Sequence, residues 1–162
     1  MDYLWSPWRY QYLTSPQEAE GCIFCAIAVD DHDERNLIVY RGSHNFIVLN
    51  LFPYTSGHLM VVPFAHAAEL CQLDEDAATE MMALTRLAER RLRAIYRPDG
   101  LNVGMNIGKS AGAGIAGHIH MHVLPRWHAD ANFMTTIAET RVLPEDLHVT
   151  WRRVHDALMA AD

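Results

Sequence analysis

The sequence is poor in lysine and has no long apolar run. Lys109 is the only lysine among 162 residues, and the formal net charge is −7 at pH 7. A general nucleic-acid-binding surface needs clustered Lys and Arg, so this composition argues against nucleic acid as a partner. No apolar stretch approaches the ~20 residues that span a bilayer, and the first residues lack the layout of a signal peptide. We therefore expect a cytoplasmic protein without a membrane anchor, in which any phosphate chemistry is local.

Cysteine is also scarce. Three cysteines in a chain expected in the cytoplasm do not form a disulfide framework. Cys22 and Cys25 form a C-x-x-C pair, whereas Cys71 stands alone and is interpreted as a small buried hydrophobe. An isolated C-x-x-C pair is typical either of a redox centre or of half a zinc site. Zinc needs two further ligands, and histidines are available for this role.

Internal repeats and low-complexity segments are missing, and half of the residues are apolar. A chain of this length can bury about 70% of its unfolded surface in one core. We expect a single domain over 1–162, with an N-terminal arm at 1–20, a core at 21–127 and a C-terminal extension at 128–162.

The hydrophobic pattern predicts an α+β fold, with a mainly antiparallel sheet, one long inserted helix and a C-terminal helix. The predicted strands are 37–40, 45–49, 58–62, 101–107, 118–123 and 133–138. The strand at 101–107 alternates, which predicts that its apolar residues Leu101, Val103, Met105 and Ile107 face the core. The long helix begins at 74–76 and ends before Pro98, a turn is expected at 130–132, and the final helix begins at Pro144.

Three histidines at two-residue spacing are the most informative feature of the chain. In a β-strand, His118, His120 and His122 would lie on one side of the strand. Imidazole can act as a nucleophile, a proton carrier or a metal ligand near neutral pH. The alternative is a half-buried strand whose polar face consists of histidine by chance, but histidine is not a favoured residue there.

A glycine-rich stretch at 108–117 precedes these histidines. Glycine permits positive φ and close approach to a ligand, and successive N–H groups can form a concave anion site. The stretch lacks the pattern of a Walker P-loop, and taken alone it is more commonly a flexible connection. Lys109 in this stretch is either an ordinary exposed lysine or a phosphate contact.

An imidazole next to an anion site indicates nucleophilic attack on phosphorus, with a covalent phosphoramidate intermediate. His120 is the natural nucleophile because its neighbours on both sides can constrain it. The competing interpretation places all three histidines on one catalytic zinc. Side chains on one strand face emerge about 6.5 Å apart, so three of them reach one ion only if the strand bends.

The segment His-Ile-His-Met-His-Val-Leu at 118–124 resembles the signature of the histidine triad (HIT) family of nucleotide-binding hydrolases and transferases. Similar segments occur in the family's order at 22–25, 46–50 and 57–63, followed by His66 and Asn106, so the resemblance covers roughly 20–127. Segments at 4–9, 49–54, 110–114 and 125–127 further resemble the bacterial branch that contains diadenosine tetraphosphate phosphorylases. Those enzymes convert the dinucleotide and inorganic phosphate into ATP and ADP.

The resemblance implies a role for each matching residue. His120 would be the nucleophile that carries the nucleotidyl group, with His58 and His122 orienting it and the phosphate. Asn50 would contact the ribose. The groups that would hold the phosphates are Asn106 and the loop residues Gly112, Gly114 and Ile115, with Lys109 as a further candidate.

The resemblance also implies a structural zinc ion held by Cys22, Cys25, His66 and His118, and a homodimer. A closed Cys2His2 site is structural rather than a Lewis acid. Two alternatives remain open at this point: a hydrolase of dinucleoside polyphosphates or nucleoside phosphoramidates, and a zinc-stabilised nucleotide-binding module without turnover.

Overall fold

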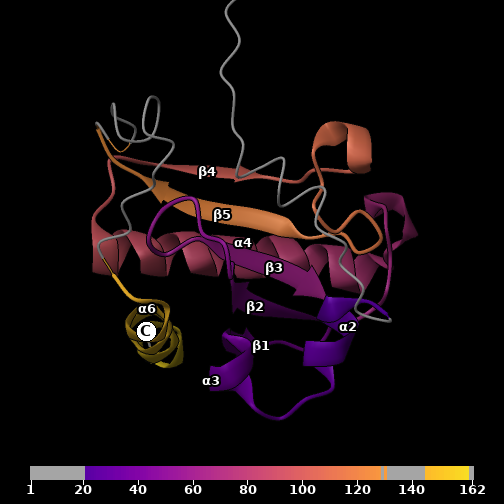
Figure 1. Cartoon of the computed structure of the whole chain (residues 1–162), viewed down its shortest axis with the longest axis horizontal. Helices are drawn as coiled ribbons and strands as arrows, with labels where there is room; N and C mark the ends of the chain where they lie inside the picture. The colour runs from indigo at the N-terminus through magenta and orange to yellow at the C-terminus, as the bar shows by residue number, and fades with distance from the viewer. Residues whose placement is uncertain (1–20, 129, 131–144, 161–162) are drawn as a thin grey trace, which may run out of the picture.

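A five-stranded antiparallel sheet forms the centre of the molecule, with the strand order β1-β2-β3-β5-β4 (Figure 1). The structure is a computed structural model that describes residues 21–128, 130 and 145–160. The strands are β1 (Ile38–Arg41), β2 (Asn45–Leu49), β3 (Leu59–Pro63), β4 (Gly100–Gly104) and β5 (Met121–Arg126). The helices are α2 (Ile23–Ala28), α3 (Asp33–Asn36), α4 (Glu75–Tyr96) and α6 (Leu147–Met159), with short 3-10 helices η1 (Leu70–Gln72) and η2 (Lys109–Ala111). The predicted α+β class and antiparallel sheet are confirmed.

The long helix α4 covers one face of the sheet, where it packs against β2, β3 and β5, and it lies behind the sheet in Figure 1. Asp74 begins the helix by accepting the Ala77 N–H at 2.6 Å, and Arg97 ends it in the left-handed conformation. Its buried positions recur at helical spacing and are Ala77, Met81, Leu84, Thr85, Ala88 and Leu92. Apolar residues at helical spacing therefore account for the buried face of α4.

The C-terminal helix α6 packs on both α4 and β1 and is seen end-on in Figure 1. Val154 and Leu158 are buried in the core, and the Trp151 Nε1–H donates to the Ile38 carbonyl at 2.7 Å. The helix begins at Leu147, where the Asp146 side chain accepts the His148 N–H, rather than at the predicted Pro144. Pro144 lies outside the described residues, as do the predicted strand at 133–138, most of the turn at 130–132 and the arm at 1–20.

The strand that carries the histidine row begins later than predicted. β5 begins at Met121, so His118 and His120 lie in the irregular segment before the strand. Continuing the register of β3 and β5 would bring Ile119 opposite Pro63, which has no N–H to donate. The Ile119 carbonyl would therefore lack a donor in such a pair. The Pro63 carbonyl lies 2.9 Å from His118 Nε2 instead, and the Ile119 N–H donates to the Ala67 carbonyl at 2.7 Å. The three histidines therefore do not lie on one regular strand, as their spacing predicted.

The strand β4 also differs from its prediction. It ends at Gly104 rather than at 107, and Val103 and Ile107 are 48% and 45% exposed instead of facing the core. The reason is that, among the described strands, β4 is the edge strand of the sheet and pairs with β5 alone. Leu101 and Met105 pack against the core as predicted.

The helices α2 and α3 are not predicted by the sequence pattern because both are short. Arg41 at the end of β1 holds them: its guanidinium donates to Asp33 and to the carbonyls of Ala28 and Asp30. This contact fixes the segment that carries the C-x-x-C pair against the sheet. Cys71, by contrast, is exposed, so its interpretation as a buried hydrophobe is wrong.

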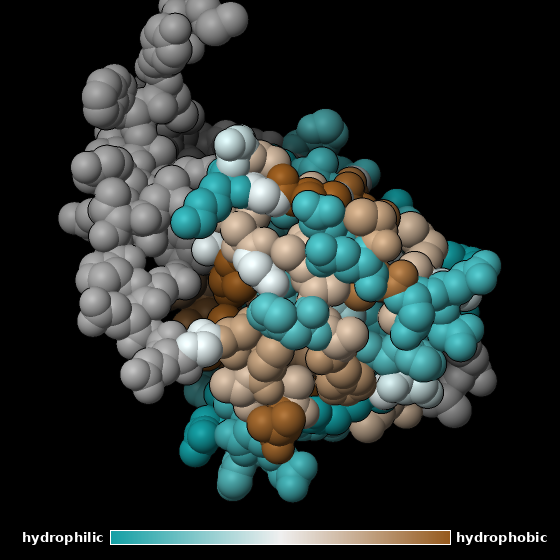
Figure 2. All heavy atoms as spheres, turned by 90° about the vertical axis from the view of Figure 1, so that its right-hand side faces the viewer, coloured by the Kyte–Doolittle hydropathy of each residue, from teal (hydrophilic) through white to brown (hydrophobic). Residues whose placement is uncertain are grey.

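No helix within the described part of the chain is long and apolar enough to cross a membrane. Figure 2 shows the end of the molecule that lies on the right in Figure 1, where brown hydrophobic patches are interspersed with hydrophilic side chains. Exposed apolar residues of the described chain include Ile23, Leu70 and Ile107. Such mixing is ordinary for a protein surface.

Candidate functional site

His58, just before β3, and His122, on the neighbouring strand β5, form a hydrogen-bonded pair. His58 precedes β3 and is fully buried, and His122 lies on β5, where it is registered against Met60. His58 Nε2 lies 2.9 Å from His122 Nδ1. The Tyr54 N–H donates to His58 Nδ1 at 3.1 Å, so the ring proton of a neutral His58 is on Nε2. His58 therefore donates to His122, and the proton of a neutral His122 is on Nε2.

His120 is fixed by the backbone of its own segment. Its Nδ1 lies 2.9 Å from the His118 carbonyl, which can only accept a hydrogen bond. The proton of the neutral ring is therefore on Nδ1, and the lone pair is on Nε2. The ring is buried, with Phe24 of α2 at 5.2 Å on one side and His122 at 4.8 Å, measured between ring centroids. His120 is thus held in the tautomer that a nucleophile at Nε2 requires.

Burial favours the neutral forms of His120 and His122. It lowers the pKa of His120, and burial together with the neighbouring His120 lowers the pKa of His122 to about 4. A neutral imidazole has the lone pair needed to attack phosphorus, whereas an imidazolium does not. At neutral pH the site therefore presents one buried nucleophilic nitrogen and one neutral N–H donor beside it.

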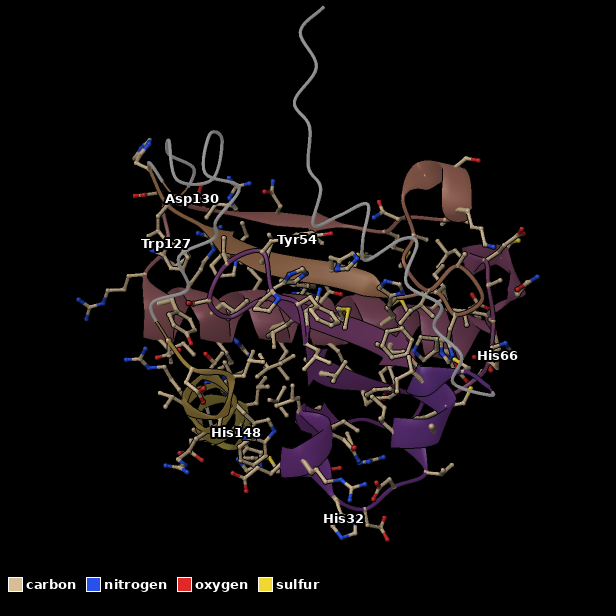
Figure 3. The ribbon with its side chains drawn as sticks, in the orientation of Figure 1. His32, Tyr54, His66, Trp127, Asp130 and His148 are labelled. Atoms are coloured by element: carbon tan, nitrogen blue, oxygen red, sulfur yellow. The ribbon has the colours of Figure 1, made fainter. Side chains whose placement is uncertain are left out.

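The remaining nucleotide-binding candidates lie in two loops, and the first of these contacts His58. The Asn50 amide nitrogen lies 3.4 Å from His58 Nδ1, and its Oδ1 accepts the Phe52 N–H at 3.0 Å. Tyr54 packs over His58 at 4.9 Å between ring centroids, and Figure 3 shows it above the middle of the sheet.

The glycine-rich loop contains the short helix η2, which is flanked by Gly108 and Gly112, both with positive φ. Asn106 and Ile115 are partly exposed in the connection between β4 and β5, and Gly114 is exposed. The Lys109 side chain is exposed as well, with no polar partner among the described residues. The geometry brings His58, His120, His122 and Asn50 together, and it leaves the loop residues accessible.

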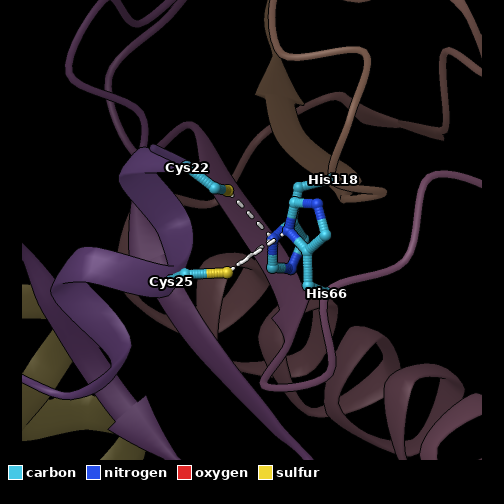
Figure 4. Close-up of side chains that lie close together, drawn as sticks. All are labelled: Cys22, Cys25, His66 and His118. Atoms are coloured by element: carbon cyan, nitrogen blue, oxygen red, sulfur yellow. Dashed lines mark hydrogen bonds between the residues drawn. The ribbon is translucent and has the colours of Figure 1, made fainter. Parts of the chain in front are cut away.

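Four side chains from distant parts of the chain converge at the end of α2. The ligand atoms of Cys22, Cys25, His66 and His118 all lie within 4.8 Å of one another (Figure 4). His118 Nδ1 lies 3.2 Å from Cys22 Sγ and 3.6 Å from Cys25 Sγ, and Cys25 Sγ lies 3.3 Å from His66 Nδ1. Sulfur and nitrogen ligands of a tetrahedral zinc ion are separated by about 3.5 Å. The cluster can therefore hold a metal ion of this kind.

The tautomer of His118 agrees with a ligand role. Its Nε2 lies 2.9 Å from the Pro63 carbonyl, so the ring proton is on Nε2 and the lone pair on Nδ1 faces the cysteines. Burial and the adjacent Cys22 thiol raise the pKa of Cys25, whereas a bound divalent cation would lower it. An ion in this cluster would tie α2 to the segment that carries His120.

Several functional contacts have no signal in the sequence. The Tyr54 N–H, the Pro63 carbonyl and the His118 carbonyl set the ring tautomers, but backbone groups leave no mark on residue type. Phe24 packs against both His118 and His120. The sequence signal for this contact is the position of Phe24 between the two cysteines of the C-x-x-C pair.

Comparisons with known proteins agree on the family of the chain. A family model described as HIT domain matches residues 32–129. AP-4-A phosphorylase of Mycobacterium tuberculosis is 42% identical over 156 residues, which cover 92% of this chain and 80% of that protein.

Solved structures show the same similarity. A zinc-bound histidine triad family protein from Mycobacterium smegmatis has a TM-score of 0.69 at 29% identity, covering 85% of this chain and 93% of its own. A hypothetical histidine triad nucleotide-binding protein from Sulfolobus tokodaii has a TM-score of 0.66 at 25% identity, covering 85% and 91%.

Proposed function

Because this chain belongs to the HIT family, we propose that it is an enzyme that cleaves diadenosine tetraphosphate with inorganic phosphate, through a nucleotidyl-His120 intermediate. The observation that carries the proposal is the hydrogen bond from His120 Nδ1–H to the His118 carbonyl, which leaves the lone pair on Nε2 of a buried neutral imidazole. The choice of substrate rests on the 42% identity to a protein named AP-4-A phosphorylase.

The reaction consists of two displacements at one phosphorus atom. His120 Nε2 attacks the α-phosphorus, the bond from that phosphorus to the bridging oxygen breaks, and ATP leaves while AMP stays on the ring. Inorganic phosphate then attacks the same phosphorus, the P–N bond breaks, and ADP is released with His120 restored. A polyphosphate is a good leaving group, so the site needs no strong general acid.

Other side chains of the site bind and orient the substrate in this proposal. The neutral His122 would donate its Nε2–H to a phosphate oxygen, and His58 would hold the ring of His122 in that orientation. Asn50 would contact the ribose. The phosphates would contact Asn106, Gly112, Gly114 and Ile115, with Lys109 as a further contact from the same loop.

We propose zinc as the ion of the Cys22, Cys25, His66 and His118 cluster, with a structural role. Two thiolates and two imidazoles form a closed tetrahedral donor set, and the similar protein from Mycobacterium smegmatis is zinc-bound. When bound, zinc would supply no Lewis acid to the reaction, and would fix the orientation of His118 and hence of the carbonyl that His120 contacts.

We further propose a homodimer located in the cytoplasm. The edge strand β4 has an open hydrogen-bonding edge in the described chain, and Val103 on it is half-exposed. A zinc site built on two cysteine thiolates is favoured in a reducing compartment. Light scattering on the eluted protein tests the dimer, and microscopy of a tagged chain tests the location.

The decisive experiment identifies the products with and without inorganic phosphate. Phosphate-dependent formation of ADP and ATP supports phosphorolysis, whereas AMP and ATP formed with water would show a hydrolase. His120→Asn should abolish turnover and retain nucleotide binding, while His148→Asn, which changes an exposed histidine on α6, should behave as wild type. Turnover that persists in His120→Asn would refute the mechanism, and a wild type that forms no nucleotidyl adduct would point to a binding module.

A further inference from the structure

Residues 145–150, at the start of the C-terminal helix region, lie against the loop at 50–58 that leads into His58. A small cavity lies behind His58, and the walls come from two parts of the chain far apart in sequence. The residues that line it include Asn50, Ser56 and His58 from the loop before β3, Glu145 just before α6, and Leu147 and Thr150 in the first turn of α6. The Ser56 hydroxyl is buried and has no hydrogen-bond partner among the described residues. The start of α6 therefore adjoins the loop that carries the buried histidine.

Tyr96, the last residue of α4, supports the residue that precedes His58. Gly57 has a φ of +78°, and a Cβ atom built on it would lie 2.9 Å from Cε2 of Tyr96 and 3.2 Å from Cδ2 of Leu92. The backbone at Gly57 thus lies directly on the tyrosine ring, which only a glycine allows. A change in the position of this ring would move the peptide group between Gly57 and His58.

Glu145 in turn holds the ring of Tyr96. The Tyr96 hydroxyl donates to Glu145 Oε2, which also accepts the Thr150 hydroxyl at 2.9 Å. Glu145 Oε1 accepts from Arg153 Nη1 at 2.8 Å, and the Arg153 guanidinium lies 5.2 Å from the centroid of the Tyr96 ring. Burial and the neighbouring carboxylate raise the pKa of Tyr96 to about 12, so its hydroxyl stays protonated and donates. Both carboxylate oxygens are thereby engaged, and the Glu145 side chain is only 15% exposed.

We propose that Tyr96 and Glu145 are positioning residues for His58, so that the C-terminal helix sets the geometry of the catalytic histidine pair. The inference rests on the proposed function, because it assigns to the His58–His122 hydrogen bond a role in catalysis. The chain of contacts runs from Glu145 through Tyr96 to Gly57, and from there to the donor at His58 Nε2. Small displacements of a catalytic group can cost large factors in rate, because the reacting atoms must be aligned.

Trp151 offers a matched control for this proposal. It also ties α6 to the rest of the protein, through the hydrogen bond from its Nε1 to the Ile38 carbonyl. That bond ends on β1 and does not touch the loop before His58. Trp151→Phe therefore removes one tertiary hydrogen bond of α6 and leaves the Glu145–Tyr96–Gly57 contacts in place.

The test compares Glu145→Ala, Tyr96→Phe, Glu145→Gln and Trp151→Phe in the full chain with its metal bound. In single-turnover experiments with diadenosine tetraphosphate, Glu145→Ala and Tyr96→Phe should form the nucleotidyl adduct about tenfold more slowly, with KM little changed. Glu145→Gln keeps an acceptor for the tyrosine hydroxyl and should restore most of the rate. The Glu145→Ala, Tyr96→Phe double variant should be no slower than either single variant, because both changes remove the same contact.

A second readout does not depend on turnover. The ring proton that His58 donates to His122 should give an NMR signal in the wild type and in Trp151→Phe, and this signal should shift or broaden in Glu145→Ala and Tyr96→Phe. If Trp151→Phe slows adduct formation as much as Glu145→Ala does, the contacts of Glu145 and Tyr96 only stabilise α6. The same conclusion follows if Glu145→Ala lowers stability without changing the rate or the NMR signal. If the wild type itself fails to form an adduct, the proposed function fails, and the NMR comparison alone decides whether Tyr96 and Glu145 position His58.

Discussion

Acidification from about pH 7.5 to about pH 5 should remove about 2 kcal/mol of folding stability through His122 alone. The perturbation acts on one buried ring whose pKa in the folded protein is about 4, lowered by burial and by the neighbouring His120. In the unfolded chain the same imidazole titrates near its ordinary pKa of about 6.5.

The sign of the effect follows from proton counts. Between these two pKa values the unfolded state binds a proton and the folded state does not, so lowering the pH favours unfolding. The loss begins as the pH falls through about 6.5, reaches about 2 kcal/mol near pH 5 and about 3 kcal/mol near pH 4, and levels off at about 3.4 kcal/mol below that. His122 therefore contributes its full stability only above its unfolded pKa.

Urea unfolding at a series of pH values measures this contribution. His122→Gln should flatten the pH dependence by about 2 kcal/mol between about pH 7.5 and pH 5, whatever its effect on stability at neutral pH. His148→Gln, which removes an exposed imidazole from α6, should run parallel to the wild type. Protonation of the metal ligands affects all three proteins alike and cancels in the comparison. Parallel curves for the wild type and His122→Gln would refute the view that burial holds His122 neutral.

Three further predictions concern stability and metal binding. Gly57→Ala should cost about 1–3 kcal/mol in urea unfolding, because the residue has positive φ and its new Cβ would meet the Tyr96 ring at 2.9 Å; a neutral result would contradict that contact. Leu92→Ala in the core should cost about 2–5 kcal/mol, whereas Met82→Ala on the exposed side of α4 should stay within about 0.5 kcal/mol, and equal costs would contradict the assigned helix face. Cys25→Ala should abolish stoichiometric zinc and lower Tm, measured by metal analysis and thermal unfolding; unchanged zinc would exclude the four-residue site.

The regular elements with strong periodicity could be predicted from sequence. The buried face of α4 and the hairpin of β1 and β2 follow from side-chain spacing, which is a local property. The start of β5 and the exposure of Val103 could not be predicted in this way. The start of β5 depends on Pro63 of the facing strand, and the exposure of Val103 depends on the position of β4 at the sheet edge. Neither property can be seen in the sequence next to β5 or Val103.

The candidate site was predictable to the level of residue types. The spacing of His118, His120 and His122 indicated chemistry at phosphorus or at a metal. The resemblance to the HIT family suggested which of them is the zinc ligand, the nucleophile and the orienting residue. The structure brings Cys22 and Cys25 beside His118 from almost a hundred residues away. The support of the Gly57 backbone by Tyr96 and Glu145 had no counterpart in the sequence, because it joins the ends of two helices to a loop.

The sequence by itself determined which reactive groups are available and where helices and strands can form, because composition and periodicity are carried by the residues alone. Only the tertiary structure decided which nitrogen of each imidazole carries the proton. His118 donates to a carbonyl 55 residues away, and His58 donates to a ring 64 residues away. The position of a ring proton is set by the partner that the fold brings within hydrogen-bonding distance. Three identical side chains in a row thereby acquire different chemistry.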